Sequence, residues 1–353
     1  MKPHLVLFFS LILFYCYSQT DGNKENAINL ARKAVKLMDN GEIDESIDLL
    51  EKAVKLDPSN YIYPYEIGYA YVLKKDYDNA IKYLEKVIKM DGVNDLGYQL
   101  LGNTYSMAGN KDKAIKTYNK GLKLFPNSGK LYLELGNVHQ DDWLKALEFY
   151  EKGILVEPTF PSNYYWASKI FCNSSEEVWG MIYGEIFMNI ERGSGRTEEI
   201  SKLLFDTYQS EIQFTSDSSV SVSFSQNNIV NVDKKDIKIP FTVIYEPTLL
   251  LATSTIDSIS LNTLNKIRTE FISFYYQKEF NDEYPNIVFD WNKKLIGEGH
   301  FESYNYWLLM KGSPEEFNYW ISENEDKFND FIDWFTNNPM PIDSQNTFHR
   351  SYY

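Results

Sequence analysis

Side chains that could act as general acids, general bases or metal ligands gather in one stretch near the C-terminal end of the chain. The set surrounds two glycines and comprises Asp290, Glu298, His300 and Glu302. Carboxylates and imidazoles do this chemistry in hydrolases and metalloenzymes. The spacing matches no motif of defined geometry, because the sequence has no paired-His helix, Cys pair, Gly-rich phosphate loop or nucleophile elbow. We assign no catalytic residue, metal or cofactor, and keep an enzyme only as a minor alternative for residues 263–340.

Aromatic side chains in the same region could do a second kind of chemistry. Glycoside hydrolysis needs only two carboxylates, and rings can stack on sugars. The candidate rings are Trp291, Tyr304, Tyr306 and Trp307. Aromatic residues at helical spacing more often form a core. A glycan- or small-ligand-binding protein that uses this aromatic region is therefore the alternative function, and a hydrolase ranks below it.

Four similar segments in the first half of the chain define the elements that could position a binding surface. They read ESIDLLEKAVKLDP, NAIKYLEKVIKMDG, KAIKTYNKGLKLFP and KALEFYEKGILVEP. Three of them end at Pro58, Gly92 and Pro126, at intervals of 34 residues (92 − 58 and 126 − 92), and the fourth ends at Pro158. Apolar residues recur at helical spacing within each segment. A period of this size predicts stacked helical hairpins in which each segment is the second helix.

Small residues at fixed positions predict where the two helices of each hairpin touch. The first helices carry Ala34, Gly68, Gly102 and Gly136, and the second helices carry Ser46, Ala80, Ala114 and Ala146. A larger side chain at these points would separate the helices. Large residues, including Tyr71 and Tyr105, fill the space between them.

This pattern resembles the tetratricopeptide repeat over about Ala27 to Phe160. The residues that carry the resemblance are Gly68, Tyr71, Ala80, Gly102, Tyr105, Ala114, Pro126, Gly136, Ala146 and Pro158. The sequence departs from the family pattern at Ala34, at Gly92, at His139 and in a shortened turn near residues 140–143. The resemblance implies a solenoid whose first helices line a concave groove, and a non-enzymatic scaffold that binds a peptide or a partner protein there.

The expected contact residues are the neighbours of the packing glycines that point away from the hairpin interior. They are Tyr65, Tyr69, Gln99, Asn103, Asn137 and Gln140. Rings can cover the side chains of a bound peptide while amides pair with its backbone. The family's carboxylate clamp is not expected, because Tyr65 and Glu134 occupy positions that would need basic residues. The alternative for these polar side chains is that they face water or the next element.

The remainder of the chain predicts an all-α protein with a possible short β-hairpin. Residues 161–212 look like a degenerate fifth hairpin with a helical extension. Residues 213–262 look like an irregular or β segment followed by a buried one, IPFTVIYEPTLLLA, which we expect to be helical after Pro247. Alternation in SVSVSFSQNNIVNV favours a hairpin that turns at residues 227–228, and a flexible loop is the alternative. Residues 263–340 predict an aromatic helical unit, followed by a tail at 341–353. The segment HFESYNYWLLMKG and the acidic aromatic helix after it resemble the C-terminal region of exported repeat proteins of Gram-negative bacteria.

The net charge of the chain and its first 18 residues indicate which partners and which cellular location to expect. The chain has 35 Lys and Arg against 50 Asp and Glu, a net charge of −15, which disfavours nucleic acid as a partner. One basic residue precedes an apolar run at positions 5–17, which is shorter than the roughly 20 residues of a membrane span. We expect residues 1–18 to be a cleaved signal peptide and 19–26 a linker, and hence a periplasmic or secreted protein without an integral membrane segment. A lipid anchor at Cys16 is disfavoured by the bulky residues before it.

Overall fold

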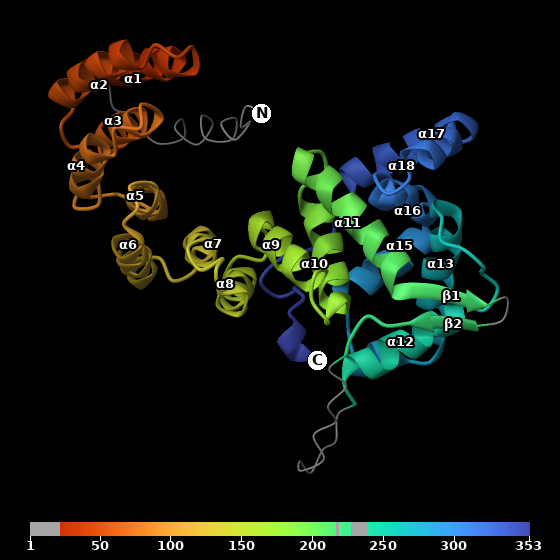
Figure 1. Ribbon diagram of the computed structural model, residues 1–353. Coiled ribbons are helices and arrows are strands. Elements are labelled where there is room, and N and C mark those ends of the chain that lie inside the picture. Colours follow the sequence, from red (N-terminus) through yellow and green to blue (C-terminus); the bar gives the residue numbers. More distant parts are fainter. Residues whose placement is uncertain (1–21, 217–218, 227–238) are drawn as a thin grey trace, which may run out of the picture. The chain divides into compact units, whose positions relative to one another are not determined.

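The computed structural model describes residues 22–216, 219–226 and 239–353 (Figure 1). The predicted signal peptide lies outside these residues. The chain divides into a first unit, Met1–Gly121, and a second unit, Leu122–Tyr353. This division falls within the predicted repeat array, so the array's boundary at residue 160 stays a prediction. None of the helices in the described ranges has both the length and the apolar character that a membrane span requires.

The first unit consists of helical hairpins, in the order that the repeated segments predict. Its helices are α1 (Gly22–Asp39), α2 (Ile43–Leu56), α3 (Ile62–Leu73), α4 (Tyr77–Val87), α5 (Asp95–Met107) and α6 (Lys111–Leu124), the last of which ends just past the division. In the second and third hairpins, the first helix packs on the second at the predicted glycine. A Cβ atom on Gly68 would lie 2.6 Å from Leu84, and one on Gly102 would lie 2.1 Å from Tyr118. These glycines are therefore required by the close approach of the helices.

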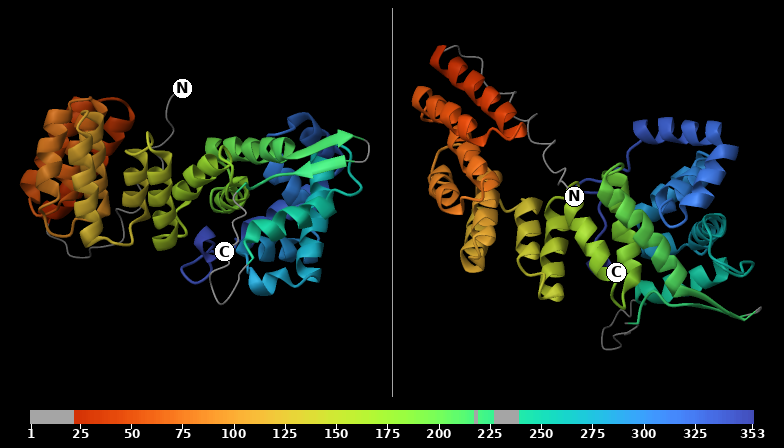
Figure 2. Two further views of the ribbon diagram at one scale, coloured as in Figure 1. Left: turned by 60° about the horizontal axis from the view of Figure 1, so that its bottom comes forward. Right: turned by 45° about the horizontal axis from the view of Figure 1, so that its top comes forward.

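The second unit begins with two more hairpins. They are formed by α7 (Gly129–Asn137) with α8 (Trp143–Val156), and by α9 (Pro161–Phe171) with α10 (Glu177–Ile190). Both views of Figure 2 show these helices running side by side. The second pair confirms the degenerate fifth hairpin. Gly180 and Gly184 permit its close packing, because a Cβ atom on either would lie within 2.7 Å of Cys172 or Ser168 on the α9 side.

The remaining helices of the second unit follow the predicted order of a helical extension, a buried segment and an aromatic helical unit. They are α11 (Gly195–Glu211), α12 (Phe241–Ala252), α13 (Leu261–Gln277), α14 (Phe280–Glu283), α15 (Ile287–Gly297), α16 (Phe301–Leu309), α17 (Pro314–Glu323) and α18 (Glu325–Asn337), and a 3₁₀ turn (Arg350–Tyr352) follows. Strands β1 (Ile212–Ser216) and β2 (Ser219–Val222) pair antiparallel. A short β-hairpin is thus confirmed in the predicted region, but it joins β2 to the preceding β1, and the turn predicted at 227–228 lies outside the described residues.

The helix around Pro247 differs from the prediction, which started it only after this residue. Instead α12 begins at Phe241 and contains Pro247. An interior Pro removes one backbone hydrogen bond and costs a helix roughly 3 kcal/mol. The ring of Phe241 is 1% exposed and lies 5.6 Å from the ring of Trp179 and 5.9 Å from that of Tyr284. Burial of this aromatic cluster offsets the cost, which local propensity alone could not indicate.

The C-terminal segment packs on the hairpins of the second unit. Phe348 is 1% exposed, and its ring lies 5.5 Å from that of Tyr183 on α10. The guanidinium of Arg350 donates two hydrogen bonds, 2.6 and 2.9 Å long, to the carboxylate of Glu151 on α8. Residues far apart in the sequence therefore share one core.

Candidate functional site

A row of three tyrosines lies along α3 in the first unit. This tyrosine stripe consists of Tyr61, Tyr65 and Tyr69, spaced four residues apart, so the three side chains share one helix face. All three are half-buried. Burial raises the pKa of each phenol, and the nearby carboxylates Glu66 and Asp95 raise the pKa of Tyr65 further. The stripe thus contains two of the predicted contact residues, Tyr65 and Tyr69, together with a third ring that sequence reasoning missed.

A carboxylate that the sequence did not single out lies beside this stripe. Glu66 is the only charged residue of α3 and is half-buried. Burial raises the pKa of its carboxyl to about 7, and no cation among the described residues lowers it. A desolvated carboxylate without a partner is unfavourable in the folded state. One sequence signal could have identified it, namely a lone charge in the otherwise uncharged segment IYPYEIGYAYVL.

The predicted amide residues divide between the two units. Gln99 and Asn103 lie half-buried on α5, and the Oδ1 atom of Asn103 accepts a hydrogen bond from the hydroxyl of Tyr118. In the second unit, Asn137 Oδ1 accepts the corresponding bond from Tyr150, at 3.0 Å. Gln140 follows in the exposed turn before α8. A core tyrosine therefore fixes the orientation of each asparagine. Whether these six residues contact a partner stays a prediction.

Of the four candidate acid, base and metal-ligand side chains, Glu298 is exposed at the C-terminal end of α15, and the other three make separate structural contacts. Asp290 accepts a hydrogen bond from Tyr276, while Glu302 accepts one from Trp320 Nε1 at 3.0 Å and pairs with Lys327 at 2.6 Å. His300 lies 4.0 Å from the carboxylate of Asp330. Among the described residues no group of three His, Cys, Asp or Glu side chains could hold a metal ion.

The rings that were considered for sugar stacking belong to the core of the second unit. Their exposed fractions are small: 2% for Trp291, 0% for Tyr304, 4% for Tyr306 and 6% for Trp307. Ring faces buried to this extent cannot stack on a ligand. The interpretation of these four side chains as a sugar platform was therefore wrong, because they pack against other helices rather than face solvent.

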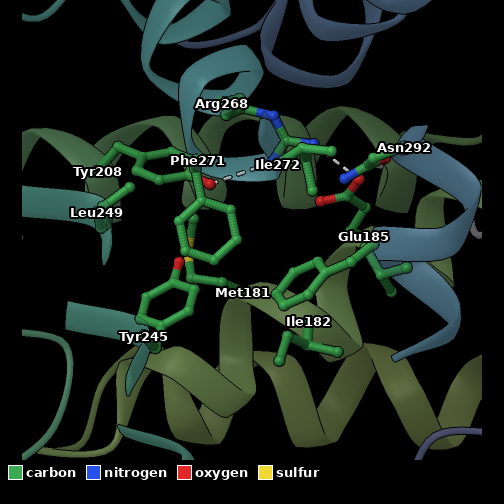
Figure 3. Close-up of a pocket in the computed structure, with 12 residues that line it drawn as sticks. Met181, Ile182, Glu185, Tyr208, Tyr245, Leu249, Arg268, Phe271, Ile272 and Asn292 are labelled. Carbon is green, nitrogen blue, oxygen red and sulfur yellow. Dashed lines mark hydrogen bonds and ion pairs between the residues drawn. The ribbon is translucent and has the colours of Figure 1, made fainter. Parts of the chain in front are cut away.

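A buried ion pair lies at the centre of the second unit (Figure 3). Arg268 on α13 and Glu185 on α10 are 2.7 Å apart, and their side chains are only 7% and 5% exposed. The same guanidinium donates to Asn305 Oδ1 at 2.7 Å and to the Tyr208 hydroxyl at 3.0 Å. Tyr304 donates to Glu185 at 3.0 Å. Each charge is thus matched by hydrogen bonds, as burial requires.

The cavity beside this ion pair measures about 20 Å³. Its wall includes Phe271, Ile272 and Asn292 (Figure 3). A volume of this size holds about one water molecule. The ion pair therefore has a structural role in this geometry, since no organic substrate fits against it.

A larger cleft of about 500 Å³ lies between α15 and the C-terminal segment. Its lining mixes apolar side chains with polar ones, among them Asp290, Lys294, Gln345 and Asn346. Clefts that bind small molecules usually have volumes of roughly 300–1,000 Å³. This cleft is large enough for a small ligand. Of the four candidate rings only Trp291 lines it, and that side chain is 2% exposed.

Two family models of the tetratricopeptide repeat match the chain, over residues 22–94 and 71–136. No curated protein matches it. Among solved structures, PilF of Pseudomonas aeruginosa is 16% identical in sequence. The match covers 54% of this chain and 86% of the PilF chain, with a TM-score of 0.45. MamA is 24% identical, and the match covers 47% of this chain and 92% of the MamA chain, with a TM-score of 0.37. The first repeat domain of Spaghetti (RPAP3), bound to the HSP90 peptide SRMEEVD, is 25% identical, with coverage of 33% and 94% and a TM-score of 0.31.

Proposed function

We propose that this tetratricopeptide-repeat protein is a non-enzymatic scaffold of the cell envelope, which binds a peptide or partner protein through the first helices of its repeats. The observation that carries the proposal is the tyrosine stripe on α3. Three half-buried phenol rings in a row combine an apolar face with a hydroxyl edge. Such rings are enriched at the centres of protein interfaces, because they bury a large area at low cost in side-chain entropy.

Site-specific photo-crosslinking tests the proposal in the native host. A benzophenone amino acid would replace Tyr65 in one variant and Lys82 in another. Lys82 is an exposed residue of α4, the second helix of the same hairpin, and serves as the matched control. We expect a discrete crosslinked product from position 65 that is absent from position 82. Equal products at both positions, or a product at position 82 alone, would place recognition elsewhere.

Side-chain replacement provides the second arm of this test. A Tyr65→Ala, Gln99→Ala variant removes two predicted contacts and leaves the tyrosine-bonded Asn103 in place. Helicity by circular dichroism should match that of the wild type, since neither residue is fully buried. Captured partner should fall at least tenfold. Retention of capture by a correctly folded variant would contradict the proposed surface.

The envelope location is part of the proposal and rests on the sequence of residues 1–18. Cell fractionation and N-terminal sequencing of the purified native protein test it. We expect the protein in the periplasm or the medium, with Gln19 as its first residue. An uncleaved chain in the cytosol would contradict export, and a lipid on Cys16 would replace the predicted cleavage site.

The cleft of the second unit favours a second candidate function, the binding of a glycan or another small polar ligand. Its lining offers a carboxylate, an ammonium group and amides, so that it can both donate and accept hydrogen bonds. Titration of the protein with a panel of neutral disaccharides, followed by tryptophan fluorescence, would test it. A response that Asn346→Ala abolishes would support this function. If no disaccharide changes the tryptophan fluorescence, glycan binding in the cleft is refuted.

A further inference from the structure

In the second and third hairpins of the first unit, lysines occur on the second helices and are absent from the first helices. The first helices α3 and α5 read IYPYEIGYAYVL and DLGYQLLGNTYSM and contain no Lys or Arg. Their charged residues are Glu66 and Asp95, both acidic. The second helices α4 and α6 carry lysines in nearly every turn, as in KDKAIKTYNKGLKL. The face formed by α3 and α5 is therefore aromatic, rich in amides and negatively charged.

The two carboxylates act electrostatically on the same phenol. Both Glu66 and Asp95 act electrostatically on Tyr65, and Asp95 also acts on Tyr61. Glu66 is additionally close to Tyr69, which Asp39 at the end of α1 influences as well. Negative charge from three helices thus converges on the tyrosine stripe. A cation placed there would meet carboxylates and ring faces together.

The state of Glu66 gives an independent reason to expect a charged partner. Its carboxylate is half-buried, and none of the cations that the structure describes forms an ion pair with it. Glutamine has the same shape and would not carry the cost of burying an unpaired charge. A residue that lowers stability where an isosteric neutral one would fit is typical of a functional surface.

We propose that the α3–α5 face of the first unit binds a peptide segment in which an Arg or Lys side chain is flanked by apolar residues. The cationic group pairs with the carboxylate of Glu66 and lies over a ring of the tyrosine stripe, while the apolar neighbours cover the remaining rings. This inference rests on the proposed function and specifies the chemistry of its partner. It is the opposite of a clamp for a peptide carboxylate, which needs basic side chains on this face.

Arg suits the surface better than Lys. A guanidinium forms two parallel hydrogen bonds to one carboxylate and stacks flat on a phenol ring, whereas an ammonium acts as a point charge. It is also more weakly hydrated, so that less hydration is lost when it enters a half-buried position. We therefore expect an Arg-containing segment to bind more tightly than its Lys counterpart.

Fluorescence anisotropy with three synthetic peptides tests the inference on the full chain at pH 8. The probes are a labelled peptide of alternating Arg and Leu with blocked ends, and versions in which Gln or Glu replaces every Arg. The protein variants are Glu66→Gln and the control Glu45→Gln. Glu45 is an exposed carboxylate on α2, so this control removes the same charge from another surface. Circular dichroism verifies that both variants fold.

The inference predicts a defined ranking. The Arg peptide should bind the wild type at least ~10-fold more tightly than the Gln peptide, and Glu66→Gln should weaken it about tenfold, as expected for a charge-assisted hydrogen bond. The control Glu45→Gln should change affinity less than about twofold, since exposed charges contribute little. Equal losses in both variants would show only general attraction to an acidic protein and would overturn the inference.

Two further outcomes separate this inference from the proposed function. If the Gln or Glu peptide binds as tightly as the Arg peptide and Tyr65→Ala abolishes that binding, the cationic partner is refuted while the interaction surface stands. If no peptide binds and position 65 also gives no crosslink in the host, both the inference and the proposed function fail.

Discussion

The buried ion pair of the second unit permits a quantitative prediction of stability. Replacing Arg268 by Met leaves the Glu185 carboxylate buried, with Tyr304 as its remaining donor, and removes the donor to Asn305 and to Tyr208. Loss of one partner of a buried ion pair costs roughly 3–5 kcal/mol. We expect Arg268→Met to lie at the upper end of that range, and Glu185→Leu, which leaves the guanidinium with two neutral partners, at the lower end.

The double variant should lose less stability than the two single variants lose together. With both charges absent, no unpaired ion remains in the core. The cost is then the unsatisfied polar atoms of Asn305, Tyr208 and Tyr304, at about 1 kcal/mol each. With single costs of about 5 and about 3 kcal/mol and a double cost of about 3 kcal/mol, a double-mutant cycle should give a coupling of roughly 5 kcal/mol between Arg268 and Glu185.

Urea unfolding followed by tryptophan fluorescence measures this coupling in the second unit alone. All 7 Trp residues of the chain lie beyond residue 121, so the signal reports no unfolding of the first unit. Far-UV circular dichroism on the same samples serves as the control for the first unit. A single variant that costs less than about 1 kcal/mol, or additive single costs, would refute the view that the charges depend on each other.

Three other predictions follow from single side chains. Burial raises the pKa of Glu66 from 4.5 to about 7, so the unfolded chain loses this proton at lower pH than the folded chain, and the wild type should lose up to about 3 kcal/mol of stability between pH 4.5 and 7. Glu66→Gln should remove this loss, as measured by urea titration with circular dichroism at pH 5 and 8. Gly102→Ala should destabilise the first unit by about 1–3 kcal/mol in urea unfolding followed by circular dichroism, because the added Cβ would lie 2.1 Å from the Tyr118 ring. The control Gly297→Ala, whose added Cβ would meet no atom within 4 Å, should leave the stability of the second unit unchanged in the same assay. Arg350→Ala should release the C-terminal segment from α8, and hydrogen exchange of residues 341–353 should rise well above that of the wild type. Unchanged exchange would show that the aromatic contacts of Phe348 and Tyr353 hold the segment without this ion pair.

The hairpins and their packing points could be predicted from the sequence because the repeat uses local rules. Period, small residues and terminal Pro or Gly act within a few turns of helix, so the sequence alone suffices to assign Gly68, Gly102 and Gly136 as packing points. The alternation in SVSV correctly predicts the strand β2 for the same reason, but its partner is β1, which precedes it, because a local pattern does not encode strand pairing.

The failed predictions concern side chains whose roles depend on distant parts of the chain. The sequence around Trp307 is the same whether its ring binds a ligand or packs in a core. Its role depends on α18, where the ring of Phe335 lies 4.9 Å from the Trp307 ring. The helix at Phe241 tolerates its interior Pro because partners from α10 and from the Tyr284 region cover it.

The sequence by itself determined the repeated hairpins, the acidic charge and the set of polar and aromatic residues on the first helices, because periodicity and composition are properties of the chain. Only the tertiary structure decided which charges are paired. Arg268 and Glu185 lie 83 residues apart and meet at 2.7 Å, whereas Glu66 is half-buried without a cation among the described residues. The pairing and desolvation of a charge depend on what surrounds it in space, which no local pattern encodes.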